Sequence, residues 1–390
     1  MFKAIHFLKS SVGAGVLLML CALAAVICAN FPPLQHLYHE FLHFNITVGV
    51  GGRELSGGLH FWVSDGLMAI FFLFVALEIK RELISGELSS MRRVMLPAAA
   101  AIGGMIAPAA IYVLFNFSGG DDVLHGWAVP IATDIAFSLS VLALLGSRVP
   151  IAMKVFLTTV AVIDDLLAIL IIAFFYAGKL QPWYLVAAAL IVIAMLVLGR
   201  IGVVRLAPYL ILGALLWVAM KNSGIHATIA GVLTAACIPH KRKPESISET
   251  PLQKLEHALH QPVALLIMPL FAFVNAGVEF AGLNPSDLLA PLPLGIALGL
   301  VVGKPVGICA AVGLALLCGV GKFPPGLNWE RVFGVALLCG IGFTVSLFIG
   351  NLAFQDVSEE MVNLTKLGVL SGSLIAGIGG WLFLHARLRG

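Results

Sequence analysis

Apolar runs of roughly twenty residues follow one another along almost the whole chain, with only short polar segments between them. A helix needs about 20 apolar residues to cross the hydrocarbon core of a bilayer. Only 11% of the 390 residues are charged, whereas a soluble domain carries about 25%. We therefore expect an all-α polytopic membrane protein with twelve transmembrane helices, folded as a single membrane domain over residues 1–390. The twelve runs are 12–29, 61–77, 95–117, 126–145, 151–176, 183–198, 206–220, 225–238, 263–278, 293–317, 332–354 and 364–384.

Basic residues are distributed unevenly over the segments that connect these runs. If the amino terminus lies in the cytoplasm, eighteen of the 23 lysines and arginines fall in inside segments, and only Arg53, Lys179, Lys221 and Lys366 fall outside. Cytoplasmic loops of membrane proteins carry such an excess of positive charge. We therefore expect a multi-pass protein with both termini in the cytoplasm. The first run, about 18 residues long, exceeds the apolar part of a signal peptide and is expected to remain as a helix.

A short segment between the first two runs has a different pattern. The stretch ITVGVGGREL alternates apolar and polar residues around Gly51 and Gly52, which is typical of a hairpin. A small external β-hairpin is expected over about 45–58, and an irregular loop is the alternative.

Three carboxylates lie near the middle of two neighbouring apolar runs. Asp134 lies in the run 126–145, and Asp164 and Asp165 lie side by side in the run 151–176. A charged side chain at the bilayer centre costs at least about 2.5 kcal/mol, so such residues usually serve a function. These three aspartates are therefore predicted to bind an ion or protons.

One basic residue, Lys304, lies inside the run 293–317, too far from either end to reach the interface easily. It needs a carboxylate partner, and the three aspartates are the acids at that depth. A buried ion pair that only fixes helix packing is the alternative interpretation.

Two of the runs carry signals for a broken helix. Pro130 lies four residues before Asp134, and Gly340 and Gly342 lie beside Thr344 in the run 332–354. Helix breaks at membrane depth are tolerated where the freed backbone groups line a cavity or bind a ligand. Two kinked helices without a function are the alternative.

A phenylalanine and a serine follow each break, as Phe137 with Ser138 and Phe343 with Ser346. This recurrence suggests an internal repeat of spans three to five and ten to twelve. Corresponding spans of the two copies are seven apart in the order, an odd number, so the repeats would be inverted, as in alternating-access transporters with sites at the membrane midplane.

The predicted chemistry is competition between a cation and a proton. Hard cations prefer oxygen ligands, which a carboxylate, the Thr133 hydroxyl and freed carbonyl groups can supply. A carboxylate also binds a proton, and burial and a neighbouring carboxylate both favour its protonated form. Asp164 and Asp165 are expected to titrate as a coupled pair. Competition at one site combined with alternating access gives antiport.

Five segments closely resemble the NhaA family of bacterial sodium/proton antiporters: ATDIAFSLSVLALLGSRVP, AVIDDLLAI, KNSGIHATIAGV, GKPVGI and LCGIGFTVSLFI. The resemblance covers nearly the whole chain in the same order. It implies that two broken helices cross at the membrane centre and that external protons are exchanged for cytoplasmic sodium or lithium. It also implies electrogenic exchange, activation at alkaline pH, no cofactor, and a homodimer in the bacterial inner membrane.

The resemblance further implies roles for individual residues. Asp165 would be the principal sodium ligand, with Asp164 as a further ligand or second proton carrier beside Lys304. Asp134 and Thr133 would face the helix breaks, and Thr133 would contribute to the sodium shell. Asp134 and Lys304 would offset the dipoles of the interrupted helices.

The resemblance also implies that the membrane domain contains two bundles with different roles. Residues 95–176 and 293–386 would form the core bundle that carries the ion site. Residues 12–85 and 183–278 would form an interface bundle for the dimer, with the external hairpin contributing to contact between protomers.

His226 matches a family position linked to the pH response, and six further residues lie in cytoplasmic segments that resemble the pH-sensing region of the family. Histidine titrates in the relevant range. An interfacial histidine without a function, and an ordinary solvated charged face, are the alternatives for this set. It comprises His226, Glu78, Arg81, Glu82, Glu256, His257 and His260.

One departure from the family is Leu167, where the family usually has a glycine that would allow close helix approach.

Two other functions are the alternatives to antiport. A sodium-coupled solute symporter would need a pocket for an organic solute, and an intramembrane aspartyl protease would need a GxGD motif, which the chain lacks.

Overall fold

Helices dominate the computed structural model, which describes residues 10–50, 53–240, 249–281 and 284–388. The chain divides into two compact units. Unit 1 contains the described parts of residues 1–38, 90–168 and 272–390, and unit 2 contains those of 39–89 and 169–271. Each unit is therefore assembled from segments that are far apart in the sequence.

Unit 1 is built from long helices and two interrupted ones. Helix α9 (Ile151–Phe175) continues from unit 1 into unit 2, as does the short α3 (Pro32–His43), and α14 (Met268–Asn275) leads from unit 2 into unit 1. The remaining elements of unit 1 are α2 (Ser11–Asn30), α6 (Met91–Asn116), η3 (Phe117–Gly119), α7 (Asp121–Leu124), η4 (His125–Ile131), α8 (Ile135–Ala143), η5 (Gly146–Arg148), η7 (Pro285–Leu289), α15 (Pro291–Leu298), η8 (Gly299–Gly303), α16 (Lys304–Leu317), α17 (Trp329–Cys339), α18 (Phe343–Phe354) and α19 (Glu359–Arg387).

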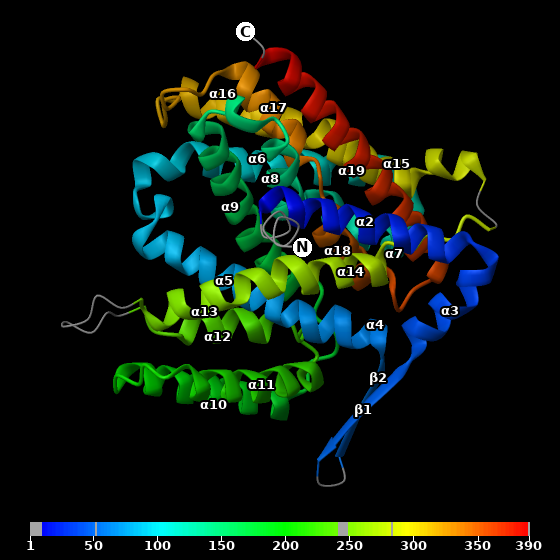
Figure 1. The fold of residues 1–390 in the computed structure, drawn as a ribbon, viewed down its shortest axis with the longest axis vertical. Helices are drawn as coiled ribbons and strands as arrows, with labels where there is room; N and C mark the ends of the chain where they lie inside the picture. The colour runs from blue at the N-terminus through cyan, green and yellow to red at the C-terminus, as the bar shows by residue number, and fades with distance from the viewer. Residues whose placement is uncertain (1–9, 51–52, 241–248, 282–283, 389–390) are drawn as a thin grey trace, which may run out of the picture. The chain divides into compact units, whose positions relative to one another are not determined.

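Unit 2 combines a β-hairpin with a group of helices. Figure 1 shows α10 and α11 side by side in green, and these two helices pack against each other. The elements of unit 2 are β1 (Asn45–Val50), β2 (Arg53–Gly58), α4 (Leu59–Phe61), η1 (Trp62–Leu67), α5 (Met68–Ser85), η2 (Glu87–Ser89), α10 (Pro182–Arg200), α11 (Leu206–Ser223), α12 (Ile229–Cys237), α13 (Pro251–Pro262) and η6 (Val263–Ile267).

Ten helices among the described residues are long and apolar enough to cross a membrane. The pair α17 and α18 would make an eleventh, bent by 45° at its break. The expected run 225–238 contains the nine-residue helix α12, which is too short to be counted as a span by itself. The structure thus has the architecture of an all-α polytopic membrane protein.

The expected hairpin is present as an antiparallel pair of strands (Figure 1). The hydroxyl groups of Thr47 and Ser56 lie 2.9 Å apart on paired residues, and the Trp62 indole donates to the Ile46 carbonyl at 3.0 Å. These contacts attach the strands to each other and to the start of η1. The predicted turn at Gly51 and Gly52 lies outside the described residues.

Local sequence explains where several helices begin. The Ser10 hydroxyl accepts from the Gly13 amide at the start of α2, and Asn328 caps α17 in the same way through the Arg331 amide. Thr250 and Gln253 form a reciprocal capping box at the start of α13. Each cap satisfies amide groups that have no partner within the helix.

Close approach of α6 and α16 organises the packing of unit 1. A Cβ atom added to Gly103 would overlap the Gly307 carbonyl oxygen, and a Cβ added to Gly307 would overlap that of Gly103. On the same two helices, Gly104 faces Ile308 and the aliphatic part of Lys304. Small residues of this kind allow membrane helices to approach closely. The contact fixes the helix that carries the buried lysine.

Candidate ion-binding site

Two interrupted helices contact each other at their breaks. The first break covers residues 132–134, between η4 and α8, and the second covers 340–342, between α17 and α18. The Asp134 amide of one break donates to the Ile341 carbonyl of the other at 2.7 Å. Just beyond the breaks, the Phe137 and Phe343 rings pack edge to face with centroids 5.5 Å apart. Pro130 and Gly342 lie where regular helix geometry is interrupted, and backbone groups at the breaks lose partners in their own helix. The bond from the Asp134 amide to the Ile341 carbonyl satisfies two of these groups across the crossing.

Asp134 lies at the amino-terminal ends of two half-helices. Its carboxylate caps α8 by accepting from the Phe137 amide at 2.9 Å. The same carboxylate accepts from the Thr344 amide at 3.2 Å and from the Thr344 hydroxyl at 2.5 Å, at the start of α18. Amino-terminal helix ends carry partial positive charge and are stabilised by a nearby carboxylate. Asp134, which is 1% exposed, therefore supplies negative charge to both helix ends.

Lys304 forms a buried ion pair with Asp164. The Lys304 Nζ atom lies 2.9 Å from Asp164 Oδ2, and the two residues are only 1% and 2% exposed. The same ammonium group donates to the Thr133 hydroxyl at 2.9 Å. Thr133 in turn donates to the Cys339 carbonyl, the last residue of α17, also at 2.9 Å. This chain of contacts connects α9, α16 and both breaks at one point.

Asp165 follows Asp164 on α9 and is also buried, with 6% of its surface exposed. Consecutive residues on a helix point about 100° apart, so the two carboxylates face different neighbours. Leu167, the departure from the family pattern, is half-buried two residues further along α9.

The backbone before Lys304 departs from regular α-helix. Residues Gly299–Gly303 form the π-helix η8, and Lys304 is the first residue of α16. Short π-helical turns inside longer helices often occur at functional sites. A Cβ added to Gly299 would crowd Pro130, and one added to Gly303 would crowd Pro108 on α6. Glycine at these two positions allows the lysine-bearing helix to approach both α6 and the first interrupted helix.

Two serines that were not among the predicted site residues also contribute to the crossing. The Ser138 hydroxyl on α8 donates to the Leu338 carbonyl on α17 at 2.9 Å. The Ser346 hydroxyl on α18 donates to the Val129 carbonyl on η4 at 2.7 Å. The recurrence of Phe and Ser after each break was the sequence signal for them, but their bonding partners required the structure.

Four residues of the predicted pH-response set form a charged cluster in unit 2. The Arg81 Nε atom lies 2.9 Å from Glu256 Oε1, and Arg81 also forms an ion pair of 2.7 Å with Glu82. Glu78 lies close enough to Glu256, Arg81 and Glu82 for electrostatic interaction with all three. Arg81 therefore holds carboxylates of α5 and α13 close together.

The three histidines of that set have other surroundings. His257 pairs with Glu249 at 2.9 Å on an exposed surface, and the His260 ring packs edge to face on Phe74 at 6.0 Å. The ring of His226 contacts Thr228 through Nδ1 at 2.9 Å and lies 3.8 Å from the Asp65 carboxylate through Nε2. The structure thus groups the acidic members of the set with Arg81 and places these histidine contacts elsewhere in unit 2.

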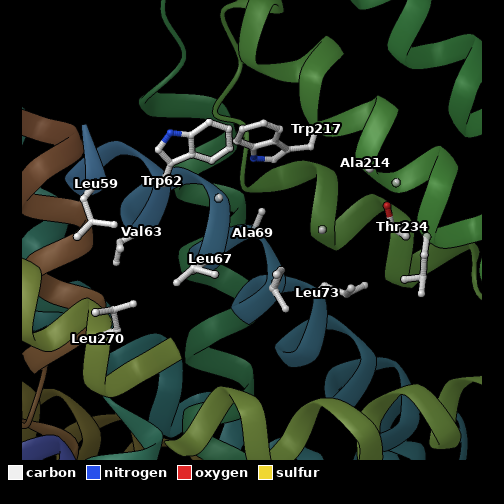
Figure 2. A pocket seen from close by; sticks show the side chains of 15 residues that line it. Leu59, Trp62, Val63, Leu67, Ala69, Leu73, Ala214, Trp217, Thr234 and Leu270 are labelled. Carbon is white, nitrogen blue, oxygen red and sulfur yellow. The ribbon is translucent and has the colours of Figure 1, made fainter. Parts of the chain in front are cut away.

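Each unit also contains a cavity with apolar walls. The cavity in unit 2 has a volume of about 510 Å³, and Figure 2 shows the stacked rings of Trp62 and Trp217 beside it. The cavity in unit 1, about 750 Å³, borders Phe137 and Phe343. Neither of these two cavities is lined by a carboxylate or a basic side chain.

In this polytopic membrane protein, two broken helices cross beside buried carboxylates and a buried lysine. These are features of secondary transporters. Comparison with known proteins assigns the family. Residues 5–384 match the model of the family described as Na+/H+ antiporter 1. The chain belongs to this family, and it is a transporter rather than an enzyme.

Several relatives are similar over nearly their full length, and each carries the name Na(+)/H(+) antiporter NhaA. The protein of Pelagibacter ubique (strain HTCC1062) is 49% identical over 97% of this chain and 96% of its own length. The protein of Shewanella loihica (strain ATCC BAA-1088 / PV-4) is 48% identical over 100% of this chain and 98% of its own. The protein of Rhodospirillum rubrum is 49% identical over 99% of this chain and 97% of its own. These matches confirm the predicted family and do not support a symporter or an aspartyl protease.

Proposed function

We propose that this protein exchanges external protons for cytoplasmic sodium or lithium through competition at the buried carboxylates beside the helix crossing. The observation that carries the proposal is the ion pair between Lys304 and Asp164, placed by Thr133 at the breaks of two crossing helices. Family membership gives the class of transport, and this arrangement supports the proposed location of the site.

Sodium and protons would bind to the same group of oxygen atoms. Asp165 is the proposed principal sodium ligand, with Asp164 and the Thr133 hydroxyl completing the shell. Sodium binding near Asp164 would weaken its attraction for the Lys304 ammonium group, because two cations then compete for one carboxylate. Proton binding would neutralise the carboxylates and release sodium. Asp164 and Lys304 are accordingly proposed as the second proton-carrying pair.

The charges around the crossing would lower the cost of keeping helix ends inside the membrane. Asp134 accepts from amides at the starts of α8 and α18, where helix dipoles are positive. Lys304 binds Thr133, which binds the terminal carbonyl of α17, where the dipole is negative. The interrupted helices can then persist at membrane depth without water to solvate their ends.

Alternating access would follow from two inverted repeats in a twelve-helix protein. The order of a long helix, an interrupted helix and a long helix occurs twice, first in α6, η4 with α8, and α9, and again in α15 with α16, α17 with α18, and α19. The proposed core bundle covers 95–176 and 293–386, and the proposed interface bundle covers 12–85 and 183–278. The short α12 would complete the twelfth crossing.

The family resemblance supports further properties of this exchange. We propose that more protons enter than sodium ions leave, so that each net charge moved draws about 2.3 kcal/mol per 100 mV from the membrane potential. Activation at alkaline pH would depend on the cluster of Glu78, Arg81, Glu82 and Glu256, with the three histidines in supporting roles. The protein would form a homodimer in the bacterial inner membrane, with both termini in the cytoplasm, and would need no cofactor.

The first test measures sodium-induced collapse of a proton gradient in everted vesicles from mildly acidic to clearly alkaline pH. Wild type should collapse the gradient on addition of sodium, and Asp165→Asn should abolish the response because an amide cannot exchange a proton for a cation. Asp356→Asn, which changes an exposed aspartate between α18 and α19, is the matched control and should behave as wild type.

Two outcomes would contradict parts of the proposal. An energised wild-type vesicle that shows no sodium response at any pH would overturn antiport, and sodium-driven uptake of an organic solute would point to symport. A fully active Asp165→Asn variant would retain antiport and move the ion site to Asp134 or Asp164.

A further inference from the structure

The hydroxyl contacts of Ser138 and Ser346 are equivalent in the two interrupted helices. Each serine lies four residues after the residue that caps its half-helix, Asp134 for α8 and Gly342 for α18. Each donates to a carbonyl near the end of the first half of the other interrupted helix, at 2.9 Å for Leu338 and 2.7 Å for Val129. The two bonds therefore join α8 to α17 and α18 to η4.

Both serines are completely buried, so neither hydroxyl is in contact with bulk water. A serine in a helix commonly donates to a carbonyl one turn earlier in its own helix, as Ser371 does to Leu367 at 2.7 Å. Ser138 and Ser346 instead donate across the crossing. Their bonds restrain the joint between two helices that each lack a continuous backbone ladder.

We propose that Ser138 and Ser346 form a reciprocal clasp that holds the two interrupted helices in the geometry needed for sodium binding. The residues between the clasp contacts include Thr133 and Asp134 on one helix and Thr344 on the other. The serines do not contact the proposed ion, and they act as positioning residues. This inference rests on the proposed site at the crossing.

The clasp raises the apparent affinity for sodium because it keeps the site assembled before sodium binds. When only a fraction of the protein is in the binding-competent arrangement, the apparent affinity falls by that fraction. Removal of one hydroxyl increases the population in which α8 and α17, or α18 and η4, are no longer held together. Sodium at saturating concentration restores the competent arrangement, so the maximal rate changes little.

The test measures the apparent KM for sodium and the maximal rate at one alkaline pH in everted vesicles containing Ser138→Ala or Ser346→Ala. Each variant should raise KM by about threefold to tenfold, the range expected for loss of one neutral hydrogen bond, with the maximal rate within about twofold of wild type. The double variant should raise KM further than either single variant. Ser371→Ala is the matched control, because its hydroxyl bonds within its own helix, and it should leave KM unchanged.

A binding measurement separates the clasp from expression or folding defects. Isothermal titration of purified protein in detergent should show weaker sodium binding for both clasp variants and wild-type binding for Ser371→Ala. Ser138→Thr keeps the hydroxyl and should bind sodium more tightly than Ser138→Ala. Unchanged KM and sodium binding in both alanine variants would overturn the clasp while leaving antiport intact, whereas wild-type protein without sodium-dependent exchange would overturn the proposed function itself.

Discussion

At the scale of single residues, the buried ion pair is the feature with the largest energetic consequences. Lys304 and Asp164 are almost completely shielded from solvent, and the ammonium group is held by two contacts of 2.9 Å. Two charges in a low-dielectric environment stabilise each other only while both are present. Loss of one partner therefore leaves the other charge buried without compensation.

Replacing one partner should therefore cost more than replacing both. Lys304→Met should destabilise the protein by about 3 kcal/mol or more, because Asp164 then lacks a cationic partner. Adding Asp164→Asn should restore much of that loss, as measured by thermal unfolding of the purified protein in detergent. Arg387→Met is the control, because it removes a half-exposed ion pair with Glu330 and should change little. Losses that simply add in the double variant would show that the two side chains do not depend on each other.

At the scale of secondary-structure elements, the contact between α6 and α16 determines where the buried lysine lies. Gly103 and Gly307 allow the backbones to approach until each glycine lies against the carbonyl of the other. Lys304 lies one turn before Gly307, so the same contact fixes the start of α16. The π-helix η8 comes directly before α16, so the backbone changes from π-helix to regular α-helix at Lys304.

Adding a methyl group at this contact should separate the two helices. Gly103→Ala and Gly307→Ala should each destabilise the protein by about 1–3 kcal/mol through overpacking, and should also lower transport because Lys304 is displaced. Gly379→Ala on α19 is the matched control, since a Cβ there meets no atom within 4 Å. Alanine favours a helix over glycine, so this control should be neutral or slightly stabilising in the same unfolding assay. Equal effects at all three positions would rule out a specific role for the helix contact.

At the scale of the whole molecule, the proposed ion site and the proposed pH-response cluster belong to different compact units. The ion site is assembled within unit 1, whereas Glu78, Arg81, Glu82 and Glu256 lie within unit 2. Control of exchange by pH through this cluster would therefore require a change of charge in unit 2 to affect the proposed ion site in unit 1. Within unit 2, the ion pairs of Arg81 with Glu82 and Glu256 hold the proposed pH-response cluster together.

Removing two carboxylates from that cluster should make activation by alkaline pH less steep. Glu78→Gln combined with Glu256→Gln should broaden the pH profile of sodium-dependent exchange, because Arg81 then keeps only one of the three carboxylates of the proposed pH-response cluster. The measurement is the exchange rate at saturating sodium across the pH range. Glu249→Gln, which removes the exposed contact with His257, is the control and should keep the wild-type profile. A double variant with an unchanged profile would assign the pH response to other residues.

Sequence alone determined the class of protein and the positions of its unusual residues. Apolar length predicts membrane helices, and the cost of burying a charge makes Asp134, Asp164, Asp165 and Lys304 candidates for function. Glycine and proline mark the breaks because their effects on the backbone are local. The family was also predicted from sequence, and the comparisons confirm it. The twelfth crossing, the ion ligands and the pH-response residues stay predictions.

Only the tertiary structure decided which groups meet. Charge alone allowed Lys304 to pair with any of three aspartates. In the structure it pairs with Asp164, which lies 140 positions away in the sequence. Likewise, Thr344 was recognised as part of a break, but its hydrogen bonds to Asp134 cross 210 positions. Ser138 and Ser346 were visible as a repeated pattern without identified partners. The physical reason is that apolar runs specify that a helix spans the membrane, whereas its rotation and its neighbours depend on packing against segments far away in the chain.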